Sequence, residues 1–336
     1  MKYPKSFKLV VGSLAATLAL GVAPMCQAQT VNTAKGDGGT VRMLINPAGT
    51  MSIPPLVIKQ FNLDKKYNIN VETVPYSNNN SAAVALQSKS TDVVILDWLA
   101  TARLKAGGVG VVGVAPFMTY VNSIIVPTNS LAKTLADLKG LKVGVQNKTG
   151  FDWIITVAAA KKKFGMDLNK EVTLHEGAVP LLRGLMERGE LQATGMWNSL
   201  APEMLASGKF RTLTTIREIS DSTGLPTVPF LFFGFREEYA KANPANVRAF
   251  VAAYQDAVKI MKSDDQLWEE QGKRMKLSPQ ATQFFKKQVR NNLLTVFTPD
   301  MAKGLSDSLD AMVDVAGPEV IGMSKLPAGL ITLDYQ

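Results

Sequence analysis

The strongest constraint on the fold of this chain is a regular alternation of short apolar segments with longer helical ones. The short segments are rich in valine, leucine and isoleucine and are bounded by turn-forming residues, a pattern typical of strands buried in a parallel sheet. Longer amphipathic stretches lie between them, and residues 151–164 are predicted to be one of these helices. The predicted strands are residues 41–45, 69–74, 92–96, 110–115, 141–145 and 171–174. This order predicts an α/β protein in which helices cover parallel-rich sheets.

Two extended segments interrupt the alternation. Residues 121–126 are apolar, lack a helical period and end at Pro127, while residues 226–235 contain four phenylalanines. We expect both segments to be strands that cross between two lobes and together form a hinge. The first lobe would consist of residues 40–125 and 228–336, and the second, inserted lobe of residues 128–225.

The N-terminal residues follow the order of a secretory signal. Lysines at positions 2, 5 and 8 precede an apolar stretch, residues 9–23, and the small-residue pattern Cys26-Gln27-Ala28 comes next. We expect cleavage near Ala28, a flexible polar tail at residues 29–39, and a periplasmic location. The alternative is an uncleaved membrane anchor, although the apolar stretch is shorter than a comfortable span.

Removal of this signal changes which chemistry the chain can support. It takes away Cys26, the only cysteine, so the mature chain would have no disulfide, no zinc–thiolate site and no cysteine nucleophile. With 46% hydrophobic residues and about 300 residues left, it can bury one or two good cores. The net charge falls from +9 to +6 with the three signal lysines, and the remaining basic residues are scattered among acids. Without a basic stripe, nucleic acid is excluded as a partner.

Motifs for catalysis are absent or incomplete. Residues 108–113 match the letters of a dinucleotide fingerprint, but a helical pattern precedes them and a strand follows, the reverse of the required order. His175 is the only histidine, and it lacks the second histidine of a zinc protease helix. We therefore expect no cofactor, no metal and no catalytic residue, and a binding protein rather than an enzyme.

The loops after the predicted strands are the best candidates for a binding site. In open α/β sheets, ligands bind beyond the carboxyl ends of the strands, where backbone amides at helix starts favour polar groups. These loops contain amides, hydroxyls and three of the four tryptophans, which suits a small-molecule pocket. The alternative for each tryptophan is packing between helix and sheet, and for residues 78–81 it is helix capping. The loops are residues 46–50, 77–81, 97–98, 117–120, 147–153, 176–177 and 197–199.

With these features in order, the chain resembles the substrate-binding components of nitrate, sulfonate and taurine ABC importers and their thiamine-precursor relatives. The matching segments are residues 54–58 (PPLVI), 82–95, 135–145 (LADLKGLKVGV), 182–197, which ends in Gly195-Met196-Trp197, and 242–244 (ANP) with the helix after them. Two stretches depart from the family pattern, residues 61–64 and 89–91. The departures leave the expected fold intact, but they prevent us from carrying over the ligand.

The resemblance implies a type II periplasmic-binding-protein fold with a ligand held between the lobes. The site residues it suggests are Asn46, Thr50, Trp98 and Tyr120 from the first lobe, and Asn147, Thr149, Trp153, Glu176, Trp197 and Asn198 from the second. Lys148 could neutralise an anion, whereas Glu176 favours an amine. The ligand class therefore stays open between a sulfonate, an aromatic or small carboxylate, and a pyrimidine-like molecule.

The resemblance also implies a function and a partner. We expect a monomer that delivers its ligand to an inner-membrane ABC permease. One alternative is an enzyme on the same fold, similar to thiamine-pyrimidine synthases, which depend on histidine and cysteine chemistry. The other is an exported sensor module that feeds a receptor or kinase.

Overall fold

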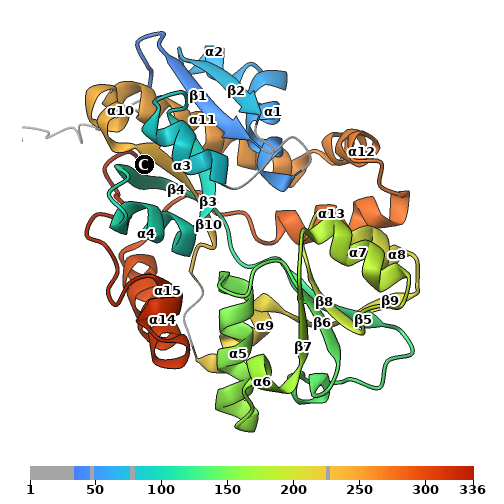
Figure 1. Cartoon of the computed structure of the whole chain (residues 1–336). Helices are drawn as coiled ribbons and strands as arrows, with labels where there is room; N and C mark the ends of the chain where they lie inside the picture. The colour runs from blue at the N-terminus through green and yellow to red at the C-terminus, as the bar shows by residue number, and fades with distance from the viewer. Residues whose placement is uncertain (1–33, 46–48, 76–79, 225–227) are drawn as a thin grey trace, which may run out of the picture. The chain divides into compact units, whose positions relative to one another are not determined.

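The computed structural model describes residues 34–45, 49–75, 80–224 and 228–336 (Figure 1). The predicted signal at residues 1–28 and the predicted site residue Asn46 lie outside the described residues. Two five-stranded sheets organise the rest, with helices packed around them (Figure 1). The α/β class expected from the alternating pattern is therefore confirmed.

The first sheet is built mainly from the N-terminal third of the chain. In spatial order, its strands are β2 (Asn70–Pro75), β1 (Thr40–Ile45), β3 (Val93–Asp97), β10 (Leu231–Arg236) and β4 (Val111–Met118). Strands β2, β1 and β3 pair in parallel, whereas β10 is antiparallel to both of its neighbours. Since β10 enters from the other sheet, it runs against the resident strands.

The second sheet repeats this plan. Its strands are, in spatial order, β7 (Thr173–Glu176), β6 (Lys142–Val145), β8 (Ala193–Met196), β5 (Ser123–Pro127) and β9 (Phe210–Thr215). Strands β6, β7 and β8 pair in parallel, and β5, which arrives from the first sheet, is antiparallel to β8 and β9. Both sheets are thus mixed, with one antiparallel strand inserted where the chain crosses over.

Helices begin at residues that satisfy their free backbone amides. Asp97, Thr215, Asp264, Ser278 and Thr298 each accept a hydrogen bond from an amide in the first turn of the helix that follows. The helices are α1 (Ile53–Gln60), α2 (Leu63–Lys66), α3 (Asn80–Gln87), α4 (Trp98–Ala106), α5 (Phe151–Phe164), α6 (Leu168–Glu171), α7 (Val179–Glu187), α8 (Ala201–Ala206), α9 (Ile216–Thr223), α10 (Glu237–Ala242), α11 (Pro244–Ser263), α12 (Asp265–Arg274), α13 (Pro279–Arg290), α14 (Pro299–Ala316) and α15 (Pro318–Ile321), with 3-10 turns at Thr50–Ser52 and Leu135–Leu138.

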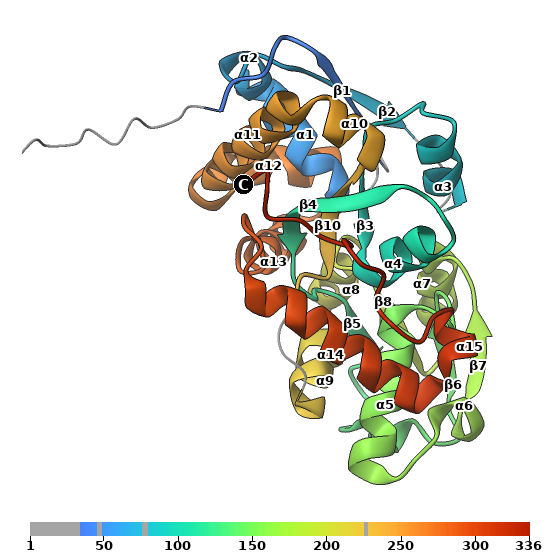
Figure 2. The same cartoon turned by 90° about the vertical axis from the view of Figure 1, so that its left-hand side faces the viewer.

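The C-terminal helices contact elements that flank both sheets. Helix α11 packs against α1 beside the first sheet, while α13 packs against α8 and α14 packs against α5 beside the second (Figure 2). One core cluster joins these parts and contains Trp98, Phe151, Phe232 and Leu305. The lobe boundaries expected from the sequence stay a prediction.

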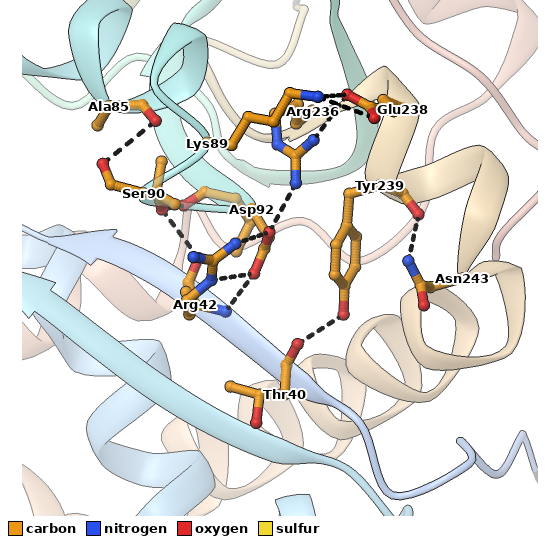
Figure 3. A network of polar contacts seen from close by, with 12 residues as sticks. Thr40, Arg42, Ala85, Lys89, Ser90, Asp92, Arg236, Glu238, Tyr239 and Asn243 are labelled. Atoms are coloured by element: carbon orange, nitrogen blue, oxygen red, sulfur yellow. Dashed lines mark hydrogen bonds and ion pairs between the residues drawn. The ribbon is translucent and has the colours of Figure 1, made fainter.

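A buried ion-pair network locks the first sheet on one side (Figure 3). The Asp92 carboxylate accepts hydrogen bonds from the Arg42 Nε and Nη2 at 2.9 and 2.8 Å and from the Arg236 Nη2 at 3.1 Å. The Asp92 side chain is 1% exposed. Because Arg42 lies in β1 and Arg236 ends β10, this carboxylate ties together two strands that are far apart in sequence.

Candidate functional site

A pocket of about 420 Å³ lies where the ends of strands from both sheets meet. The first sheet contributes residues 49–51 and the segment from β3 into α4. The second contributes the residues after β6, the first turn of α5 and the residues after β8. The crossover residues 121–124 and 230–231 complete the lining. The position agrees with the rule that ligands of α/β sheets bind at strand ends.

Two carboxylates line this pocket, one beside each sheet. Asp97 ends β3 and caps α4, with its Oδ1 accepting from the Ala100 amide at 2.8 Å. Burial raises the pKa of the Asp97 carboxyl, although the Ala100 hydrogen bond and the Arg103 charge oppose the shift. The local sequence determines this position: β3 ends at Asp97, and the Asp97 side chain caps α4, which begins at the next residue.

Asp152 is the second carboxylate, in the first turn of α5. Its Oδ2 accepts a hydrogen bond from the Asn122 Nδ2 at 2.7 Å, while its Oδ1 is covered by protein and has no partner among the described residues. Burial raises the pKa of Asp152 to about 6, and the negative charge of Asp97 acts in the same direction against the Asn122 hydrogen bond. At neutral pH the carboxylate is ionised and poorly compensated.

Arg103 is the cation in the described lining, and its hydrogen bonds are directed to the backbone. Its Nε donates to the Ile321 carbonyl at 2.7 Å, and its Nη2 donates to the carbonyls of Thr149 and Val320 at 2.9 and 3.0 Å. The guanidinium therefore ties α4 to the end of α15 and to the loop before α5. Burial lowers the pKa of Arg103, with the Asp97 charge opposing.

Aromatic rings form the apolar part of the lining. Trp153 and Trp197 line the pocket, and their indole nitrogens donate to Asn169 Oδ1 at 2.8 Å and to Gln146 Oε1 at 2.9 Å. Phe151 and Phe230 also line it, with ring centroids 5.5 Å apart. Because both indole N–H groups are already bonded, the tryptophans offer a ligand ring surface rather than a hydrogen bond.

One hydrogen bond joins the two sides of the pocket directly. The Thr50 hydroxyl donates to the Asn198 Oδ1 at 3.1 Å, and both residues are buried. The Asn198 Nδ2 is buried without a partner in the described part of the chain. A ligand with a hydrogen-bond acceptor would satisfy this amide.

The residues suggested by the sequence fall into three groups. Thr50, Asn147, Trp153, Trp197 and Asn198 lie together in the pocket lining. Trp98, Tyr120, Thr149 and Glu176 are not part of the lining, and Asn46 is outside the described residues.

The four residues outside the lining have other surroundings. Trp98 and Tyr120 are buried in the core beneath the pocket lining. There, Tyr120 stacks on the lining residue Phe151 at a centroid distance of 4.8 Å. Thr149 donates its amide and hydroxyl hydrogens to the Asn147 Oδ1. Glu176 is an exposed residue at the end of β7. These side chains support or surround the pocket rather than line it.

The charged residues of the pocket were not among the predicted site residues. Asp97 adjoins Trp98 and Asp152 adjoins Trp153, and in both pairs the tryptophan was the predicted site residue. The rule that sites follow strand ends already covered both aspartates. Arg103 and Asn122 gave no comparable signal, since one lies in the middle of a helix and the other in a crossover.

Neither a cluster of metal ligands nor a membrane-spanning helix occurs in the part of the chain that the structure describes. The described residues contain no group of three or more histidine, cysteine, aspartate or glutamate side chains placed to hold a metal ion. Nor does any helix in them have both the length and the apolar character needed to cross a bilayer.

Comparison with known proteins extends these observations. The model of the family described as NMT1/THI5 like matches residues 64–266. None of the curated proteins gives a significant match.

Solved structures with a similar fold include three that are named for what they bind. The alkanesulfonate-binding protein SsuA from Xanthomonas axonopodis pv. citri, bound to MOPS, is 17% identical with a TM-score of 0.71, and the match covers 87% of this chain and 98% of that one. The periplasmic aliphatic sulphonate binding protein SsuA from Escherichia coli is 18% identical with a TM-score of 0.72, covering 87% and 90%. The periplasmic nitrate-binding protein NrtA from Synechocystis PCC 6803 is 16% identical with a TM-score of 0.56, covering 73% and 69%. These likenesses confirm the predicted periplasmic-binding-protein fold.

Proposed function

Because this chain belongs to the NMT1/THI5-like family, we propose that it is a solute-binding protein that holds a small molecule between its two sheets and delivers it to an ABC importer. The observation that carries the proposal is the pocket of about 420 Å³, lined from both sheets by aromatic rings and a few polar groups. A volume of this order suits a small organic molecule. Structural neighbours named as sulfonate- and nitrate-binding proteins support the same role.

The mechanism involves binding and closure without a chemical step. The ligand first contacts the residues of one sheet, and rotation about the two crossovers then adds contacts from the other. Because the closed form makes more ligand contacts, the ligand shifts the population toward it. A monomeric, exported protein in this form would present its closed surface to a membrane permease.

A binding screen tests this function. The full chain is expressed with its N-terminal residues, the secreted protein is purified, and its melting temperature is measured with sulfonates, carboxylates, amines and pyrimidines. A ligand at a hundred times its dissociation constant stabilises the folded state by about 2.7 kcal/mol. Recovery of the bound molecule without chemical change supports delivery, whereas its conversion points to an enzyme. If no small molecule binds, the proposed function is wrong.

A further inference from the structure

The charged groups of the pocket bear on the ligand class, which the sequence left open between anions and a pyrimidine-like molecule. The described lining contains three charged residues, Asp97, Arg103 and Asp152. Their formal charges leave the lining negative. Lys148, which the sequence suggested as a partner for an anion, is exposed and is not part of the lining.

Arg103 is poorly placed to offset both carboxylates. Its three hydrogen bonds run to the backbone carbonyls of Ile321, Thr149 and Val320. No ion pair within 4.0 Å joins Arg103 to either aspartate in the described chain. The guanidinium therefore holds the scaffold together, and although its charge acts on Asp97, the formal charge of the described lining stays negative.

The carboxylates have few hydrogen bonds of their own. The hydrogen bond from the Ala100 amide to Asp97 and the one from the Asn122 amide to Asp152 both come from uncharged donors. Neither aspartate forms an ion pair with any described residue. A partly desolvated carboxylate without a cationic partner is costly, and a positively charged ligand would remove that cost.

The remaining lining residues suit the same kind of ligand. Asn198 is 6% exposed, and its unpartnered Nδ2 requires a hydrogen-bond acceptor. The rings of Trp153, Trp197 and Phe230 line the pocket, and aromatic faces attract organic cations. The pocket thus combines negative charge, ring surface and one free donor.

We propose, on the basis of the proposed function, that the ligand is an organic cation whose protonated amine or amidinium group lies against Asp152 and Asp97. An acceptor atom elsewhere in the same molecule meets the Asn198 Nδ2. Sulfonates, nitrate and carboxylates are disfavoured, because each would bring a further negative charge toward two carboxylates. The fold is shared with neighbours named as sulfonate- and nitrate-binding proteins, whereas the described lining of this pocket has a negative formal charge.

Three probes with the same ring but different charge test this proposal: benzamidinium, benzoate and benzenesulfonate. Their binding to the secreted protein is measured by ligand-observed NMR and calorimetry at pH 7.5, where Asp152 is ionised. We expect benzamidinium to bind and both anions to bind at least about tenfold more weakly. Tighter binding of either anion overturns the inference and leaves the proposed function standing.

Substitutions that preserve the shape of the side chain then show which carboxylate binds the cationic probe. Asp152→Asn and Asp97→Asn each replace a carboxyl group with an uncharged amide of the same shape, and asparagine keeps the cap of α4 in the second case. Asp264→Asn is the matched control, because Asp264 also caps a helix, α12, by accepting from the Leu267 amide outside the pocket.

Benzamidinium affinity should fall about tenfold or more in each pocket variant and stay unchanged in Asp264→Asn. Unchanged affinity in both pocket variants overturns the inference. If benzamidinium, the two anions and every molecule of the broader screen fail to bind, the proposed function and the inference fail together.

Discussion

The carboxylates of Asp92 and Asp152 are both shielded from water, but the protein compensates their negative charges to different extents. Asp92 lies beside the first sheet and accepts three hydrogen bonds from the guanidinium groups of Arg42 and Arg236 (Figure 3). Asp152 lies in the pocket, with one hydrogen bond from Asn122 and an oxygen that has no described partner. The first carboxylate is fully paired within the chain, and the second is not.

The difference separates a structural charge from a functional one. A buried charge persists without great cost only when opposite charge and hydrogen bonds surround it. Where the chain supplies both, as at Asp92, no uncompensated charge is left for a ligand to neutralise. Where it supplies neither in full, as at Asp152, the folded protein carries a cost that a ligand can relieve, and such sites concentrate where function is.

The largest effect should follow from breaking the paired site. Asp92→Asn removes the charge that compensates Arg236, whose side chain is 13% exposed. We expect a loss of about 3–5 kcal/mol in the free energy of unfolding, measured by urea denaturation. Asp307→Asn is the control, because its ion pair with Lys303 is exposed and lies outside this network, so it should contribute less than about 1 kcal/mol. If both substitutions lower the free energy of unfolding equally, Asp92 is not a specially stabilising charge, and the comparison with Asp152 is wrong.

The opposite sign is expected at the pocket site. Asp152→Asn removes a poorly compensated charge, so the ligand-free protein should become more stable at pH 7.5. The pKa of Asp152 is raised to about 6 from 3.8, which corresponds to about 3 kcal/mol at neutral pH. Because the folded protein holds the proton more tightly, wild-type stability should approach that of the variant as the pH falls from 7 through 6 toward 4.

Urea unfolding of both proteins at several pH values checks this prediction. A destabilised Asp152→Asn variant at pH 7.5 would show that Asp152 is a structural residue like Asp92. A difference between the proteins that does not change with pH would show that its carboxyl does not titrate as expected.

The smallest effect concerns the ring of Trp197. Trp197→Ala removes aromatic surface from the lining and should weaken ligand binding by about 1–2 kcal/mol while the ligand-free protein still folds. Trp197→Phe keeps a smaller aromatic ring and loses the hydrogen bond to Gln146, so it should weaken binding less. Calorimetry with the ligand found by screening measures both, and equal losses would indicate that the indole N–H matters more than the ring.

Much of the architecture could be predicted from local patterns. The apolar segments at residues 41–45 and 92–96 became β1 and β3 within a residue or two, and the helix expected at residues 151–164 is α5. The sheets proved mixed, because the direction of β5 and β10 depends on which sheet the chain enters from. No local pattern encodes that direction.

The pocket was predictable in place but not in detail. The strand-end rule brought Thr50, Asn147 and Asn198 into one lining. It could not separate Trp153, which lines the pocket, from Trp98, which is buried beneath the lining, because both start a helix after a strand. That distinction depends on how α4 and α5 rest on their sheets.

The sequence by itself determined the layered α/β elements, their order and the edge at which a ligand would bind, because hydrophobic periodicity and helix starts are local properties. Only the tertiary structure decided which charges are paired. Arg42 and Arg236 reach Asp92 from strands nearly two hundred residues apart, whereas Arg103 turns to backbone carbonyls and leaves Asp152 to Asn122. Pairing is a matter of distance in space, so composition and spacing could not reveal it.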